Sequence, residues 1–359
     1  MSTSVSAQPE ARRQPTLVVE LTRRCNHDCV HCYNAWKDAA RYPADGELDT
    51  ADMLGMLDKL LGETGASRVS LTGGEPLLRA DLPEIVDVLG GRGVALQLIS
   101  NGSLLTPPAI ARLGGGRIEL FELPLLSSEA AMHDELSQAP GAYARVTRAI
   151  AGLKLAGERV VVVFVATKRN IGDFGGVLEL AYALGVDGVM LNRFNPGGRG
   201  RRHLDELLPS PAELRAALDV ANTLASRFGL RVSCSIPMPR CLFDHARWPA
   251  VGFGVCGLGT AEAYPTVDPL GHLRPCNHSR TILGNVRHES FWTLLDGPKM
   301  RAYLGAHSAF CRDCSDLARC QGCCKAAAEA CTGSPLECDP WLAAFQHEAR
   351  KLMWRPKAS

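Results

Sequence analysis

Residues 16–32 read TLVVELTRRCNHDCVHC, an apolar run followed closely by three cysteines. The apolar run at 16–21 predicts a β-strand. Active sites of parallel α/β sheets lie at the carboxyl ends of the strands, so Cys25, Cys29 and Cys32 stand where a functional site is expected. Three closely spaced thiolates can bind three irons of a [4Fe–4S] cluster and leave its fourth iron open.

Zinc is the alternative that this spacing leaves open. Structural zinc sites take four ligands and often pair two cysteine knuckles. His27 or His31 could supply a fourth ligand beside the three cysteines. Spacing alone therefore predicts a metal centre, of either the iron–sulfur or the zinc type.

Up to about residue 230, strand-like and helix-like patterns alternate. We expect strands at residues 16–21, 68–71, 94–99, 118–123, 160–166, 188–194 and 230–234. We expect helices at 50–61 (with Asp49 as N-cap), 82–89, 107–113, 143–156, 174–184 and 211–228. Strand-then-helix repetition with Leu- and Val-rich strands indicates an α/β fold with a parallel sheet covered by helices. Periodicity fits both a partial barrel and an open doubly wound sheet.

Cysteine is the outlier in the composition, with 14 among 359 residues. Such a number indicates either disulfides or metal. Disulfides need an oxidising compartment, and residues 1–14 lack the apolar segment of a signal peptide. We therefore expect metal binding, a cytoplasmic protein and a disordered tail at residues 1–15.

The charge balance and the apolar runs argue against nucleic acid and membranes as the main partners. The net charge is +1, from 39 basic and 38 acidic side chains, which argues against nucleic acid or a membrane surface as the main partner. Apolar runs such as 160–166 are too short to span a bilayer.

Three further motifs follow successive predicted strands. TGGEP (72–76) comes after the second strand and SNG (100–102) after the third, while His133-Asp134 and PGAY (140–143) come after the fourth. Together with Cys-x3-Cys-x2-Cys, these motifs resemble those of the radical SAM superfamily. The resemblance implies a partial (β/α)6 barrel and a [4Fe–4S] cluster on Cys25, Cys29 and Cys32. Its open iron would chelate S-adenosyl-L-methionine, which is cleaved to a 5′-deoxyadenosyl radical.

The same resemblance assigns residues to S-adenosylmethionine binding: Gly73, Gly74, Glu75, Pro76, Ser100, Asn101 and His31. The two glycines would let the backbone approach the ligand without an intervening Cβ. Glu75 would accept hydrogen bonds from the methionine ammonium. His31 stands where the family often has an aromatic residue.

The predicted sixth strand ends in polar residues. Asn192, Arg193 and Asn195 are candidates for facing the cofactor or the substrate. The alternative is that they cap a solvated loop at residues 197–202.

Beyond residue 235 the pattern changes to short elements, frequent Gly and Pro, and most of the cysteines. Their spacing, with Gly271-x4-Cys276 and Cys-x2-Cys-x5-Cys-x3-Cys at 311–324, resembles the SPASM extension of radical SAM enzymes. The resemblance implies two further [4Fe–4S] clusters. An inner cluster would bind Cys256, Cys276 and Cys324, with Cys241 as its expected fourth ligand, and an outer cluster would bind Cys311, Cys314, Cys320 and Cys338.

Two departures limit these assignments. Zinc knuckles are the alternative for the cysteines at 311–324. Asn277 stands where sulfatase-maturing members of the family carry an acidic residue, so sulfatase maturation is disfavoured.

We expect a radical SAM core at residues 16–235, a SPASM domain at 236–345 and a C-terminal helix or tail at 346–359. The resemblance implies an oxidoreductase that abstracts hydrogen, with a ribosomally synthesised peptide as the favoured substrate. An external donor such as flavodoxin or ferredoxin would supply electrons. Because the first strand begins near Thr16, we expect either a separate protein to recognise the peptide or the peptide to dock directly in the cleft. A dehydrogenase or epimerase of a sugar or cyclitol is one alternative, and a zinc-binding interaction protein is an alternative of another class.

Overall fold

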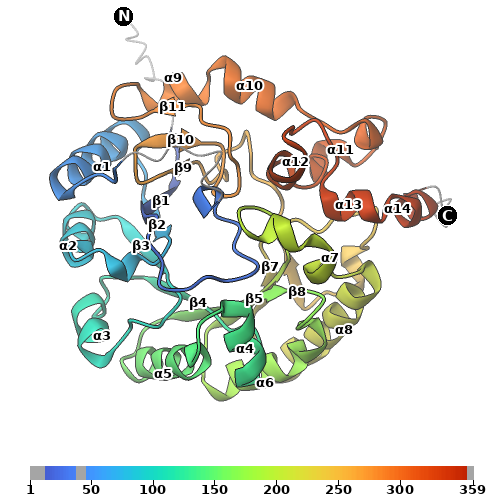
Figure 1. The fold of residues 1–359 in the computed structure, drawn as a ribbon, viewed down its shortest axis with the longest axis horizontal. Helices are drawn as coiled ribbons and strands as arrows, with labels where there is room; N and C mark the ends of the chain where they lie inside the picture. Colours follow the sequence, from blue (N-terminus) through green and yellow to red (C-terminus); the bar gives the residue numbers. More distant parts are fainter. Residues whose placement is uncertain (1–12, 38–45, 354–359) are drawn as a thin grey trace, which may run out of the picture.

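A computed structural model describes residues 13–37 and 46–353. Most of the expected N-terminal tail (1–12) and the last six residues therefore lie outside the described part. Figure 1 shows a ring of helices around a curved sheet. This arrangement confirms the α/β fold and the partial barrel, because most helices of the first half lie on the outside of the strands.

One mixed sheet of eleven strands runs through the protein in the order β11-β10-β9-β1-β2-β3-β4-β5-β6-β7-β8. Neighbours from β1 to β8 pair in parallel. The strands are β1 (Thr16–Thr22), β2 (Arg68–Gly73), β3 (Ala95–Ile99), β4 (Leu120–Pro124), β5 (Val160–Ala166), β6 (Gly188–Arg193), β7 (Val232–Cys234), β8 (Val251–Phe253), β9 (Thr266–Val267), β10 (His272–Arg274) and β11 (Gly284–Asn285).

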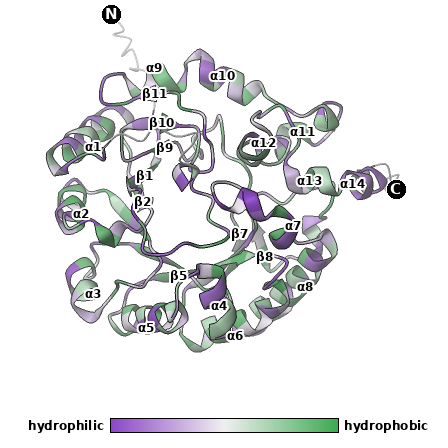
Figure 2. Cartoon of the chain, viewed as in Figure 1, coloured by the Kyte–Doolittle hydropathy of each residue, from purple (hydrophilic) through white to green (hydrophobic). Residues whose placement is uncertain are grey.

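The helices of the first half are α1 (Thr50–Thr64), α2 (Leu82–Gly91), α3 (Pro107–Leu113), α4 (Ala130–Ser137), α5 (Ala142–Leu155), α6 (Phe174–Ala183), α7 (Leu204–Leu207) and α8 (Pro211–Phe228). Asp49 caps α1 as predicted, accepting a hydrogen bond from the amide of Asp52 at 2.9 Å. In Figure 2 green and purple stretches alternate along these helices, as expected where one helix face packs on the sheet.

The two faces of the strands differ in polarity. Leu17, Val19 and Leu21 of β1 are at most 1% exposed and belong to the main apolar core with residues of α1 and α2. Side chains alternate along a strand, so the opposite face lines the barrel interior. There Ser70 donates to Gln97 at 2.8 Å, and Gln97 donates to Glu122. The barrel interior therefore carries a chain of polar side chains across β2, β3 and β4.

The second half continues the same sheet. β8 extends it beyond β7, and β9 pairs in parallel with β1, so the sheet crosses the expected domain boundary at residue 235. The remaining helices are α9 (Phe291–Leu295), α10 (Pro298–Gly305), α11 (Leu317–Cys320), α12 (Lys325–Thr332), α13 (Pro340–Ala344) and α14 (Gln346–Met353). None of the described helices has both the length and the apolar character needed to cross a membrane.

Candidate cluster and cofactor site

The cysteine loop (residues 25–32) leaves the carboxyl end of β1, and its three thiols are free. Burial raises the pKa of Cys32 to about 11 and raises that of Cys29 further. The neighbouring charges of Cys32 and Cys25 add to the shift at Cys29, so the three thiols lie close together. Thiols whose pKa values are raised in this way stay protonated at neutral pH, whereas bound iron would take the place of the protons.

Side-chain amides hold the cysteine loop against the turns that follow β2 and β3. Asn34 donates to the carbonyl of Gly73 at 2.8 Å. Asn101 donates to Asn26 at 2.8 Å, and Asn26 donates to Ser103 at 3.3 Å. The structure thus brings the Gly-Gly-Glu-Pro and Ser-Asn-Gly motifs to the cysteine loop.

Glu75 connects those two turns. Its side chain is fully buried, and its carboxylate accepts hydrogen bonds from the Ser100 hydroxyl (2.8 Å), the Asn101 amide (2.8 Å) and the Leu77 amide (3.1 Å). Burial raises the pKa of Glu75 to about 7. A carboxylate has about four acceptor positions, so three donors leave one for a ligand ammonium.

The glycines before Glu75 are required by a contact that the sequence did not reveal. Gly73 has a φ of 129°, and a Cβ there would collide with the carbonyl of Thr22. A Cβ on Gly74 would overlap the carbonyl of Arg24. Both glycines therefore let the turn pack against the backbone that leads into the cysteine loop. A close approach of this turn to the ligand stays a prediction.

Two histidines near the site differ in their partners. His31 has a buried Nδ1 without a hydrogen-bond partner among the described residues, and burial lowers its pKa to about 4. His133 has a structural contact, since its Nδ1 accepts from the amide of Leu126 at 3.1 Å. The unpartnered ring nitrogen of His31 beside buried thiols is the pattern expected where a bound group completes the site.

Segment 195–200, which follows β6, covers the cysteine loop. The amide of Gly200 donates to the carbonyl of Cys32 at 3.0 Å. A Cβ on Gly197 would collide with the backbone of Tyr33. Residues 195–198 are buried, so the alternative of a solvated loop is wrong for this part of the chain.

Two of the polar residues at the end of β6 have structural partners. Arg193 forms an ion pair with Asp339 at 2.6 Å, and both side chains are fully buried. Asn192 accepts hydrogen bonds from the amide and hydroxyl of Ser235, both at 2.9 Å. These contacts join β6 to Asp339 in the second half and to Ser235 at the end of the first. A direct contact of Arg193 or Asn192 with the cofactor or substrate stays a prediction.

Asn195 is placed differently, between the two halves of the protein. Its amide lies 3.1 Å from His278 and donates to the Sγ of Cys324 at 3.4 Å. Burial raises the pKa of Cys276 to about 12, and the charges of Cys324 and Cys256 add to the shift. The three cysteines expected at the inner cluster therefore lie together, with Asn195 in contact with one of them.

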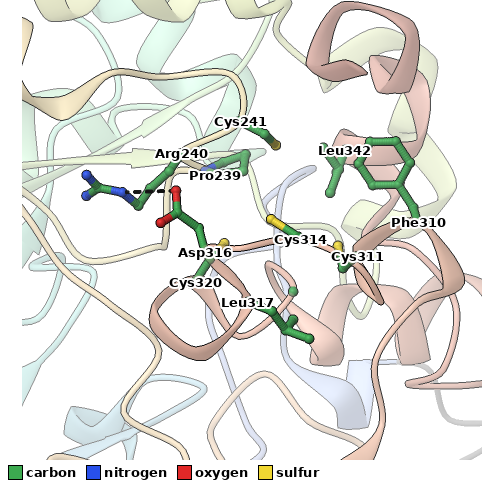
Figure 3. Close-up of a pocket in the computed structure, with 11 residues that line it drawn as sticks. Pro239, Arg240, Cys241, Phe310, Cys311, Cys314, Asp316, Leu317, Cys320 and Leu342 are labelled. Carbon is green, nitrogen blue, oxygen red and sulfur yellow. Dashed lines mark ion pairs between the residues drawn. The ribbon is translucent and has the colours of Figure 1, made fainter. Parts of the chain in front are cut away.

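The outer cysteines form a separate group. Cys311, Cys314 and Cys320 line one pocket, and Figure 3 shows Cys241 in the same pocket. Cys338 lies near this group. Burial has the largest effect on the pKa of Cys311, and the charge of Cys338 raises that pKa further. The expected position of Cys241 at the inner cluster is therefore corrected: the turn that follows β7 brings this thiol to the outer group.

The donor set fits iron–sulfur clusters. All 14 cysteines lie in the described part of the chain, and all are free. Within residues 13–37 and 46–353, no three His, Cys, Asp or Glu side chains converge as ligands of a single metal ion would. Thiols gathered in three groups are the ligands that [4Fe–4S] clusters take.

Comparison with known families agrees with these groups. The radical SAM superfamily model matches residues 19–181, and the SPASM model, an iron–sulfur cluster-binding domain, matches residues 256–324. The chain is 30% identical to PqqA peptide cyclase of Methylocella silvestris, over 90% of this chain and 86% of that one. It is 28% identical to AdoMet-dependent heme synthase of Methanosarcina barkeri, over 91% and 96% respectively.

Among solved structures, the fold is similar to that of SuiB from Streptococcus suis, determined with its precursor peptide SuiA. The TM-score is 0.72 at 14% identity, covering 92% of this chain and 75% of SuiB. Family models, relatives and fold agree, and the chain belongs to the radical SAM superfamily as a member with a SPASM domain.

Proposed function

We propose that this radical SAM enzyme oxidises a ribosomally synthesised peptide. Cys25, Cys29 and Cys32 would hold the first cluster, and the residues expected around S-adenosylmethionine are His31, Gly73, Gly74, Glu75, Pro76, Ser100 and Asn101. When bound, these groups supply a 5′-deoxyadenosyl radical that removes a hydrogen atom from an unactivated C–H bond. The position of the cysteine loop at the mouth of a barrel with polar side chains in its interior supports this arrangement.

The chain's own residues would hold the cofactor and exclude water. Glu75 has one acceptor position left for the methionine ammonium. Segment 195–200 covers the cysteine loop and limits the access of water to it. His31 presents an unpartnered Nδ1 for a hydrogen bond to the bound groups.

The contact between the two halves is the observation that carries the oxidative outcome. Removing one hydrogen atom leaves a substrate radical, and an oxidation then requires that a proton and an electron also leave. Tyr33, next to Cys32, lies on His278, which follows Cys276 by two residues. This contact supports an inner cluster on Cys256, Cys276 and Cys324 as the acceptor of that electron.

The substrate class rests on the relatives. The 30% identical relative is a peptide cyclase, which favours a peptide. The similarity to the heme synthase extends over as much of the chain as the similarity to the peptide cyclase, so a tetrapyrrole is the second candidate substrate. A sugar or cyclitol is the alternative that the sequence left open.

Partners and compartment complete the proposal. A flavodoxin or ferredoxin would reduce the first cluster, and a separate recognition protein would present the peptide. Fourteen free cysteines support a reducing compartment, the cytoplasm. We retain residues 16–235 and 236–345 as the two domains, joined by a shared sheet.

The test incubates the reconstituted enzyme with S-adenosylmethionine, reductant and one substrate at a time. The substrates are short peptides encoded beside the gene, an iron tetrapyrrole and a cyclitol. We expect one peptide to lose the mass of two hydrogens as 5′-deoxyadenosine forms. Turnover of the tetrapyrrole or the cyclitol, with every peptide unchanged, would replace the peptide in this proposal.

A further inference from the structure

The outer cysteine group contains one thiol more than a cluster needs. A [4Fe–4S] cluster takes one terminal ligand for each of its irons. The SPASM pattern already provides Cys311, Cys314, Cys320 and Cys338. The structure adds Cys241, which lines the same pocket as the first three.

Contacts on both sides hold the turn that presents Cys241. Leu242 and Phe243 are 2% and 1% exposed, and both of their amides donate to the carbonyl of Pro239. Arg215 donates to the carbonyl of Leu242 at 3.1 Å. The Cys241 backbone is therefore fixed by the protein core.

An ion pair joins this turn to the outer cysteines. Arg240 lies 3.8 Å from Asp316, which stands between Cys314 and Cys320 in the sequence. Figure 3 shows this pair at one side of the pocket, and the sulfur of Cys241 facing the side where Cys314 and Cys311 lie. Cys241 is thus presented to the outer group by its neighbours.

Cys338 reaches the outer group by a different route. It precedes Asp339, which is anchored by Arg193 and by the amide of Trp341 at 2.9 Å. The charge of Cys338 raises the pKa of Cys311. The pKa of Cys241 is raised, after the larger effect of burial, by the charges of Cys320, Cys311 and Cys314. Cys241 and Cys338 are therefore held by different parts of the protein, and both lie near the other three cysteines of the outer group.

We propose that Cys241 is an alternative fourth ligand of the outer cluster, able to bind the iron that Cys338 otherwise binds. The proposal rests on the cluster assignment made above. In the exchange the Fe–S bond to Cys338 breaks and that thiolate takes up a proton, while the Cys241 thiol loses a proton and forms an Fe–S bond. No electron is transferred, so the oxidation state of the cluster does not change.

The test counts iron in reconstituted variants. The wild type should hold about twelve irons per chain, four for each of three clusters. We expect C338A to keep about twelve, because Cys241 binds instead, and C338A/C241A to keep about eight. C338A/C234A is the matched control and should keep as many as C338A, since Cys234 on β7 is not among the residues that line the outer pocket and only burial raises its pKa.

A second readout follows Cys241 itself. In anaerobic C338A, iodoacetamide should not alkylate Cys241 until a chelator removes the iron, as measured by mass spectrometry. Electron paramagnetic resonance of reduced C338A should show three clusters, and circular dichroism should show that every variant is folded.

The outcomes separate this inference from the cluster assignment beneath it. A wild type with fewer than about twelve irons would overturn the cluster assignment and this inference together. A complete wild type combined with a C338A variant that loses the outer cluster would overturn the inference alone. A C338A/C241A variant that still holds about twelve irons would also overturn it, because the fourth ligand would then come from elsewhere.

Discussion

Tyr33 lies against His278, with their ring centroids 4.0 Å apart and their planes tilted by 35°. The Tyr33 hydroxyl also accepts a hydrogen bond from Asn277 at 3.0 Å. Tyr33, which follows Cys32 of the first group, is therefore in direct contact with Asn277, which follows Cys276 of the inner group. This contact between the two halves links the first and inner cysteine groups.

Replacing Tyr33 by Leu should uncouple S-adenosylmethionine cleavage from substrate oxidation. We expect unchanged iron content and continued formation of 5′-deoxyadenosine, with fewer product molecules per cleavage, at a stability cost of about 1 kcal/mol for the lost ring contact. Tyr33→Phe is the control, since it keeps the ring and loses only the bond from Asn277. Equal product ratios in the Leu variant and the wild type would show that the contact is not on the electron route.

Replacing Cys25, Cys29 and Cys32 together by Ala should abolish formation of 5′-deoxyadenosine with dithionite. About four irons per chain should be lost, the content of one cluster, while the other clusters remain. Iron analysis and chromatography of the nucleoside products test this directly. Undiminished cleavage would mean that another group binds the cofactor.

Gly74→Ala should prevent the turn before Glu75 from packing on the cysteine loop. Its Cβ would overlap the backbone carbonyl of Arg24, so we expect loss of the first cluster and of S-adenosylmethionine binding. Gly62→Ala in α1 is the control, since nothing lies within 4 Å of its added Cβ. That change should stabilise the protein by up to about 1 kcal/mol. Normal ligand affinity in Gly74→Ala would contradict the prediction.

The buried ion pair of Arg193 and Asp339 predicts strong effects of single substitutions. Arg193→Met leaves a carboxylate that is fully buried without its cation, so unfolding free energy should fall by about 3–5 kcal/mol. The double variant Arg193→Met with Asp339→Asn should regain part of that loss, because the neutral amide oxygen can still accept from the Trp341 amide. Urea unfolding of the metal-free chain measures both, and a single variant as stable as the wild type would disprove the role of the pair.

Glu122 predicts a pH dependence of stability. Burial raises its pKa to about 7 in the folded chain, above the ordinary value of 4.5. The folded state therefore favours the protonated acid, and the stability that Glu122 contributes is fully present below pH 4.5 and lost as the pH rises through about 7. Glu122→Gln should remove this part of the pH dependence. Urea unfolding at several pH values gives the unfolding free energy of each protein as a function of pH. The same pH dependence in Glu122→Gln and the wild type would contradict the prediction.

Local patterns were enough to predict β1 to β7 and most of the helices that connect them. The run at 160–166 became β5 with the same bounds, and 107–113 became α3, because both carry strong apolar patterns between clear breakers. The motifs after β1, β2 and β3 were also expected to meet, since the carboxyl ends of parallel strands share one edge. Helix α4 was missed, because residues 130–137 have little amphipathic pattern and only three buried side chains.

What the sequence could not reveal depends on contacts between distant residues. Cys241 was assigned to the inner cluster because of its place in the chain, but the turn after β7 carries it to the outer group. Segment 195–200 has the composition of a solvated loop, yet it is buried because its glycines pack on the cysteine loop. Strands β9 and β11, of two residues each, are too short to produce a pattern of their own.

The pairing of β9 with β1 has a consequence for how the protein avoids self-association. An open barrel leaves the backbone groups of its first strand unpaired, and such an edge can recruit a strand from another molecule. Val18 and Val19 of β1 pair instead with Thr266 and Val267, which come from the far end of the sequence. The second half therefore covers the edge of β1 by pairing with it. A fragment that ends before β9 would leave this strand edge free to pair with other molecules and would be prone to aggregate.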